Sequence, residues 1–153
     1  MPDPSPPIAA PAVDVGRTTP ILRVADLDAS IAYYARALGF AEQWRAGGFA
    51  QVGRGQAALM LSQGDQGHAG SWVYVGVSDA DALHDELRAR GARVRHPPAN
   101  YPWGARELQV TDPDGHVLRF GSDAVPGEPL GDWLDGDGVR WVPQPDGTWR
   151  AAG

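Results

Sequence analysis

Two short stretches in the second half of the chain have the pattern of paired strands. The stretch 107–111 (ELQVT) alternates polar and apolar residues with the two-residue period of a half-buried strand, and 116–120 (HVLRF) reads as its partner. Between them lies 112–115 (DPDG), in which proline presets φ, aspartate tolerates turn geometry and glycine accepts a positive φ. This pattern predicts an antiparallel hairpin spanning 107–120.

The first half of the chain predicts a strand, a helix and three further strands. The helix has one apolar stripe formed by Ile31, Tyr34 and Leu38, with Asp26 in position to cap its start and Gly39 in position to end it. The elements in order are a strand at 18–24, a helix at 27–38, and strands at 41–45, 49–53 and 57–62.

The same order of elements recurs after a polar, glycine-rich linker at 63–70. A strand at 71–77, a helix at 80–90 and a short strand at 93–95 precede the hairpin. Asp79 begins the second helix as Asp26 begins the first, and the two aspartates are 79 − 26 = 53 residues apart. A single βαβββ unit leaves one face of its sheet uncovered. Two units therefore predict an α+β fold: a curved eight-stranded sheet with helices outside and a concave inner face that holds a ligand.

This repeat divides the chain into four expected segments. They are a proline-rich disordered leader at 1–16, a first module at 17–63, a second module at 71–122 and a C-terminal extension at 123–153. Within the extension, 130–134 predicts one helical turn, and 139–142 with 148–150 predict a small hairpin.

Three tryptophans of the extension, Trp133, Trp141 and Trp149, need burial. They can cover the back of a sheet or extend the wall of the concave face. We expect the first arrangement, because exposed tryptophans usually pack against an available apolar surface.

The composition excludes several kinds of site and partner. The chain has no cysteine, which excludes disulfides and thiolate metal sites, and its formal net charge is −6 with a pI of about 5.0. An acidic chain lacks the basic surface that binds nucleic acid and attracts cations instead. No segment is long enough to span a membrane, and the N-terminus lacks the pattern of a secretory signal, so we expect a cytoplasmic protein.

Three motifs resemble the vicinal-oxygen-chelate superfamily, which includes glyoxalase I, extradiol dioxygenases and bleomycin-resistance proteins. They are RVADLDAS at 23–30, LGF at 38–40 and DPDG at 112–115, and the resemblance covers roughly residues 17–122. Enzymes of the superfamily usually hold a divalent metal on the inner face of the sheet. The resemblance places the four ligand positions on Thr19, at or beside Met60, on Trp72 and on Arg119. None of these is a competent ligand, so we expect neither a metal nor another cofactor.

The four histidines do not restore such a metal site in this interpretation. His68 lies in the linker, His84 on an exposed helix face, His96 beside a Pro-Pro pair and His116 at the exit of a turn. We expect all four to be solvated surface residues.

Aromatic residues stand where metal ligands would be, and here the chain resembles the bleomycin-binding resistance proteins. The matching motifs are FAxV at Phe49, WVxV at Trp72 and WGxRE at Trp103 with Arg106 and Glu107. The resemblance implies that flat drug rings stack on aromatic side chains in a groove between two subunits. It also implies that the subunits exchange an N-terminal strand at a proline, here Pro20. The expected ligand-binding residues are Phe49, Trp72, Tyr74, Tyr101, Trp103, Arg106 and Glu107.

The expected function is therefore sequestration of a bleomycin-type drug, cationic and planar aromatic, by a homodimer without chemical turnover. Three alternatives stay open at this stage. The first is a metal-dependent glyoxalase- or dioxygenase-type lyase or oxygenase whose displaced site uses Glu107, Gln109 or His116. The second is another aromatic antibiotic, of mitomycin or enediyne type, because the segment 95–103 is shorter than in the bleomycin binders. The third is a biosynthetic or regulatory protein that binds a small metabolite.

Overall fold

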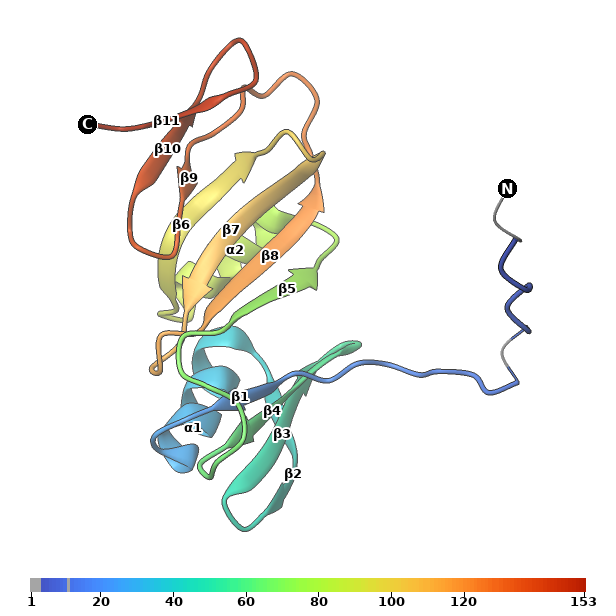
Figure 1. Ribbon diagram of the computed structural model, residues 1–153. Coiled ribbons are helices and arrows are strands. Elements are labelled where there is room, and N and C mark those ends of the chain that lie inside the picture. The colour runs from blue at the N-terminus through green and yellow to red at the C-terminus, as the bar shows by residue number, and fades with distance from the viewer. Residues whose placement is uncertain (1–3, 11) are drawn as a thin grey trace.

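In the computed structural model, which describes residues 4–10 and 12–153, eight strands form two four-stranded sheets, each with its own helix (Figure 1). The first module consists of β1 (Ile21–Arg23), α1 (Leu27–Leu38), β2 (Ala41–Ala46), β3 (Phe49–Arg54) and β4 (Ala57–Ser62). The second consists of β5 (Trp72–Gly76), α2 (Ala80–Ala89), β6 (Arg93–Asn100), β7 (Ala105–Thr111) and β8 (Val117–Asp123). The extension adds β9 (Trp133–Leu134), β10 (Arg140–Pro143) and β11 (Trp149–Ala151).

The two modules have the same topology. The strand orders are β1-β4-β3-β2 and β5-β8-β7-β6, and in each sheet the first strand runs parallel to its neighbour while the other pairs are antiparallel. This is the βαβββ unit that the repeat predicts, so the α+β fold class is confirmed. The eight strands form two separate sheets rather than one continuous hydrogen-bonded sheet.

Both helices begin as the capping pattern predicts. The side chains of Asp26 and Asp79 each accept a hydrogen bond from the backbone N–H three residues on, at 3.0 Å in both cases. Gly39 ends α1 in the left-handed conformation, with φ of 71°. A residue with a Cβ would be strained at this position, which is why glycine follows the apolar stripe directly.

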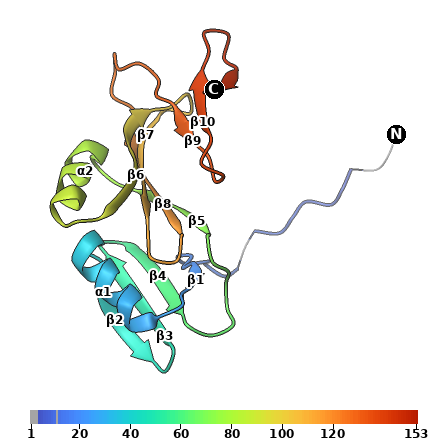
Figure 2. The same cartoon turned by 90° about the vertical axis from the view of Figure 1, so that its left-hand side faces the viewer.

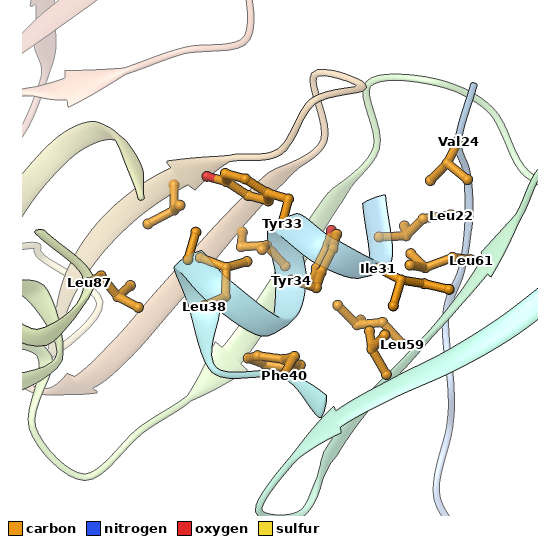
Figure 3. Packing of buried hydrophobic residues seen from close by; sticks show 14 of the residues in the cluster. Leu22, Val24, Ile31, Tyr33, Tyr34, Leu38, Phe40, Leu59, Leu61 and Leu87 are labelled. Atoms are coloured by element: carbon orange, nitrogen blue, oxygen red, sulfur yellow. The ribbon is translucent and has the colours of Figure 1, made fainter. Parts of the chain in front are cut away.

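One apolar core joins the two helices to the helix-covered face of each sheet (Figure 3). Leu59 and Leu61 of β4 point into this core, whereas Met60 between them points away, because side chains alternate along a strand. The same cluster continues from α1 to Leu87 of α2 and to Phe120 of β8. The helices therefore cover one face of each sheet, and the other face is open.

The DPDG turn of the second module is joined to the first module by hydrogen bonds. The Asp112 carboxylate is 2% exposed and accepts hydrogen bonds from the Tyr34 hydroxyl at 2.8 Å and from the backbone N–H groups of Asp114 and His116 at 2.9 Å. Burial raises the pKa of the Asp112 carboxyl, and burial together with the Asp112 charge raises the pKa of Tyr34 well above its ordinary value. The turn thus connects the two modules through the buried Asp112 carboxylate, although Pro113 and Gly115 are exposed.

The expectation that every histidine is solvated is wrong for His96 and His116. His116 is fully buried: its Nδ1 accepts a hydrogen bond from the Ser71 N–H at 2.9 Å, and its Nε2 donates to the Arg23 carbonyl at 2.7 Å. His96 is 5% exposed. The partners come from distant parts of the chain, so local polarity does not reveal this burial.

Strand β6 is longer than the expected strand at 93–95 and continues through Pro97 and Pro98. Proline lacks an N–H donor, but β6 is an edge strand, and its register with β7 shifts between His96 and Ala99. These two features let the strand accommodate both prolines.

The N-terminal segment is exposed and belongs to no helix or strand over residues 4–10 and 12–16. Residues 1–3 and 11, which are part of the expected disordered leader, lie outside the described residues. Pro20 directly precedes β1, and its carbonyl accepts a hydrogen bond from the Met60 N–H at 2.9 Å. Strand exchange at Pro20 stays a prediction.

Candidate ligand-binding site

The open face of the second sheet gathers aromatic and charged side chains. Trp72 and Tyr74 come from β5, and Trp103 comes from the turn between β6 and β7. Strand alternation adds Glu107 of β7 and Arg119 of β8 to this face, because their neighbours Leu108 and Phe120 are buried in the core. The three aromatic side chains are 37–51% exposed and are therefore accessible to a ligand.

An ion pair between the buried Glu107 and the partly exposed Arg119 organises this face. The Glu107 side chain is 1% exposed and accepts hydrogen bonds from Arg119 Nε at 2.7 Å and Nη2 at 3.0 Å, and also from Trp103 Nε1. The Arg119 guanidinium lies 4.9 Å from the Trp133 ring centroid, 5.5 Å from that of Tyr74 and 5.8 Å from that of Trp103. Glu107 thus fixes the cation against which three aromatic rings are arranged.

The C-terminal extension forms one wall of the site. Figure 2 shows the sheet of β9, β10 and β11 on the side of the second sheet opposite α2. The Leu134 carbonyl of β9 accepts hydrogen bonds from Arg95 at 3.1 Å and from Gln109 at 3.0 Å, which attaches the extension to β6 and β7. The expectation that its tryptophans cover the back of a sheet is therefore wrong, and the predicted helical turn at 130–134 is replaced by β9.

Trp133 is the centre of the aromatic contacts. Its ring meets Tyr101 and Trp103 edge to face, at centroid distances of 5.3 and 5.5 Å, and it lies 6.1 Å from Trp72. A pocket of about 560 Å³ adjoins these rings. It is lined by Trp103, Arg119, Trp133, Asp135, Trp141 and Trp149. The sequence placed Arg119 only at a metal-ligand position, not among the ligand-binding residues, and it offered a wall formed by the tryptophans of the extension only as the less favoured arrangement.

Tyr101 is buried beneath Trp103 and supports its ring. The residue is 2% exposed, its ring stacks on Trp103 at 4.9 Å, and its hydroxyl donates to the Asp132 carbonyl at 2.9 Å. Burial raises its pKa far above the ordinary tyrosine value. Tyr101 is thus a neutral platform beneath Trp103, and its expected direct contact with ligand stays a prediction.

Two of the expected ligand-binding residues have side chains that lie away from the aromatic face of the second sheet. Arg106 precedes Glu107 on β7 and therefore points to the opposite face, where its Nε donates to the Asp81 carboxylate of α2 at 2.9 and 3.0 Å. Phe49 lies on the first sheet and stacks on Trp44 at 6.0 Å with an interplanar angle of 5°. Within one chain, neither joins the cluster around Trp103, and their roles in binding stay predictions.

The side chains on this face do not fit a divalent metal. The expected ligand position at Arg119 carries a positive charge, and the Glu107 carboxylate is already engaged by Arg119 and Trp103. Both nitrogens of His116 have backbone partners, so its ring is not free to ligate a metal. Among the residues that the structure describes, no group of three His, Cys, Asp or Glu side chains could hold a metal ion.

Asp132 holds the extension through charged partners, which makes this attachment dependent on pH. One carboxylate oxygen lies 3.0 Å from His96 Nε2, and the other accepts a hydrogen bond from Arg140 Nε at 2.6 Å. Burial alone would raise the pKa of the Asp132 carboxyl, but His96 and Arg140 hold it below its ordinary value. A lowered pKa means that this stabilisation is present above about pH 4 and is lost as the pH falls through the folded-state pKa.

We therefore expect acidification below about pH 4 to loosen the extension in the native protein. The difference in unfolding free energy between the native protein and Asp132→Asn should shrink over that range, and the fluorescence of the adjoining tryptophans should change with it. Urea unfolding at several pH values measures the difference. A constant difference down to pH 2.5 would contradict the attachment through Asp132.

The fold is that of paired βαβββ modules, with an exposed aromatic face on the open side of the second sheet. The chain belongs to the Glyoxalase/Bleomycin resistance protein/Dioxygenase superfamily, whose family model matches residues 15–120. The match ends before the extension, so β9, β10 and β11 lie outside it. No functionally curated protein matches the sequence.

Several solved structures share this fold. The bleomycin-binding protein from bleomycin-producing Streptomyces verticillus, solved with copper(II)-bleomycin, is 28% identical with a TM-score of 0.62, over 73% of this chain and 99% of that one. TioX from Micromonospora sp. ML1 is 27% identical with a TM-score of 0.60, over 72% and 98%. A glyoxalase/bleomycin resistance protein/dioxygenase from Nocardioides is 28% identical with a TM-score of 0.58, over 78% and 92%. Over the residues described here, no helix has the length and apolarity needed to cross a membrane.

Proposed function

We propose that this protein binds a bleomycin-type drug, cationic and planar aromatic, and sequesters it without chemical turnover. The observation that carries the proposal is the exposed aromatic face formed by Trp72, Tyr74 and Trp103, where enzymes of the superfamily usually hold a metal. The similarity to a bleomycin-binding protein solved with its ligand supports the same class of ligand.

The energetics of such a face are sufficient for tight binding. Each aromatic stacking pair contributes about 0.5–1.5 kcal/mol beyond the burial of area, and a cation over an indole contributes about 0.5–2 kcal/mol. Several contacts of this kind, added to desolvation, reach the roughly −8 kcal/mol that corresponds to micromolar affinity. The net charge of −6 attracts a cationic ligand to the protein.

We propose that two subunits form a homodimer. In this dimer, the open face of the first sheet in one subunit lies opposite the aromatic face of the second sheet in its partner. That open face carries Phe49 stacked on Trp44, and Met60 lies beside them across the β3–β4 pair. The exposed N-terminal segment carries Val13 and Val15, which are 74% and 95% exposed, and it would cross to the partner at Pro20. A homodimer would thus bring Phe49 to the ligand, which a single chain does not.

Calorimetric titration of the chelator-treated protein with metal-free bleomycin tests the proposal, with tryptophan fluorescence followed in parallel. We expect saturable binding near two drugs per dimer, accompanied by quenching. Sedimentation of the same sample measures the assembly state. An absence of binding would remove bleomycin as the ligand, and turnover of the drug would contradict sequestration.

Trp72→Ala is expected to weaken drug binding by about tenfold or more while the fold is retained. Trp72 is 37% exposed on the open face, so truncating its ring removes a stacking surface without opening a cavity in the core. Titration of the variant with the drug measures the change. Val139→Ala, which removes an equally exposed apolar side chain outside the pocket lining, is the matched control and should bind as the native protein does. Loss of folding in Trp72→Ala would instead assign Trp72 to the core.

A further inference from the structure

The extension builds a pocket that a single chain completes by itself. Its volume of about 560 Å³ is within the range of small-molecule sites. Three of its tryptophans come from the extension, which lies outside the family match, and only Trp103 and Arg119 come from the second module. The pocket shares Trp103 with the aromatic face, but it differs from the proposed groove between subunits because it needs no residue of a partner.

Strand register places the three tryptophans of the extension on one face of their small sheet. Trp133 of β9 stands directly opposite Trp141 of β10. Trp149 of β11 stands opposite Pro143, which is two residues from Trp141 and therefore on the same face. Trp141 Nε1 donates to Asp135 Oδ2 at 2.8 Å, which fixes the orientation of that indole. The walls are thus preformed by backbone pairing, so a ligand would not have to order them.

Most polar groups of the pocket are already paired; within the described part of the chain, the indole N–H groups of Trp133 and Trp149 and one nitrogen of Arg119 have no hydrogen-bond partner. The indole N–H of Trp103 donates to Glu107, and Asp135 Oδ1 accepts the backbone N–H groups of Asp137 and Val139 at 2.9 Å each. Arg119 pairs with Glu107 through Nε and Nη2, whereas its Nη1 makes no hydrogen bond within the described part of the chain. One charged donor is therefore left beside the indole walls.

The position of Arg119 decides the charge of the ligand. Its guanidinium already lies over the Trp133 ring at 4.9 Å, where a ligand cation would otherwise bind. A second cation there would be repelled by Arg119, whereas a carbonyl or carboxylate oxygen would accept a hydrogen bond from Nη1. Indole walls favour a flat ring, because offset stacked and edge-to-face contacts both need planar partners.

We propose that this tryptophan pocket binds a planar aromatic group carrying a carbonyl or carboxylate oxygen. The ring stacks against the indoles, and the oxygen accepts a hydrogen bond from Arg119 Nη1. This second site goes beyond sequestration in the groove, and its ligand class differs in charge from a cationic drug.

The experiment uses 2-naphthoate as the probe and follows the six indole N–H signals by NMR, assigned with single Trp→Phe variants. We expect naphthoate to shift the signals of Trp141 and Trp149, which line the pocket, by more than that of Trp44, which does not. The amine analogue, 2-naphthylmethylammonium, should bind at least about tenfold more weakly, because it places a cation beside Arg119. Cyclohexanecarboxylate, which lacks a flat ring, should also bind at least about tenfold more weakly.

Trp149→Ala should weaken naphthoate binding by about tenfold or more, and Val142→Ala, on the opposite face of β10 from Trp141, should leave it unchanged. Trp149→Leu keeps apolar bulk without a stacking surface, so it serves if the alanine variant does not fold. Shifts confined to Trp44, equal affinity for the amine and the carboxylate, or native binding in Trp149→Leu would each overturn the proposal. The probe is not an antibiotic, so this result is independent of whether bleomycin binds.

Discussion

Replacing Glu107 by alanine is expected to lower the free energy of unfolding by about 2–3 kcal/mol, less than for a fully buried ion pair because the Arg119 side chain is 28% exposed. The carboxylate is fully buried and is the only anion paired with Arg119 among the described residues. Its loss leaves a guanidinium and the Trp103 N–H without an acceptor among aromatic rings. The same change should weaken ligand binding, because Arg119 and Trp103 lose the group that positions them.

Urea unfolding of the variant measures this loss. Glu128→Ala is the matched control, because Glu128 is exposed and its side chain makes no hydrogen bond within the described part of the chain, so its change should stay below about 0.5 kcal/mol. The double variant Glu107→Leu with Arg119→Leu should lose less stability than Glu107→Ala, since removing both charges leaves none unpaired. A loss below about 1 kcal/mol in Glu107→Ala would contradict this prediction, because it would mean that solvent replaces the carboxylate as the partner of Arg119.

Replacing Asp112 by alanine is expected to cost about 3 kcal/mol, because three donors lose their buried acceptor at the junction of the modules. These donors are the Tyr34 hydroxyl and the backbone N–H groups of Asp114 and His116. Urea unfolding again measures the change. Asp65→Ala, in the exposed linker, removes the same charge and should change stability by less than about 0.5 kcal/mol. A loss below about 1 kcal/mol in Asp112→Ala would contradict this prediction, because it would mean that the hydrogen bonds of Asp112 contribute little to the stability of the fold.

The pH dependence of this second effect has a definite sign. Burial raises the pKa of Asp112, so its contribution to stability is fully present below the ordinary pKa and is lost as the pH rises through the folded-state value. The difference in unfolding free energy between the native protein and Asp112→Asn should therefore be largest in acid and decrease toward neutral pH. This is opposite to the behaviour expected for Asp132→Asn. Urea unfolding of both variants across the same pH range measures the two differences. The same direction of change with pH in both variants would contradict one of the two predictions.

Local patterns in the sequence determined the two modules and the face of the second sheet that carries the candidate site. Asp26 and Asp79 start helices, the DPDG turn closes a hairpin, and alternation places Trp72 and Tyr74 on one face of β5. Each signal depends on residues a few positions apart, which is why it could be interpreted without coordinates. Alternation along β7 also separates Arg106 from Glu107, and the similarity of the WGxRE motif outweighed that local evidence.

Only the tertiary structure decided which residues share the site. The sequence predicted that the tryptophans of the extension need burial. Their position against Trp103 depends on hydrogen bonds from Arg95 and Gln109 to the Leu134 carbonyl, across 25–39 residues. The burial of His116 depends in the same way on Arg23, which lies 93 residues away. Phe49 lies in the other module and is apart from the aromatic face within one chain. Such contacts depend on the packing of whole elements, and the composition of any single segment does not encode them.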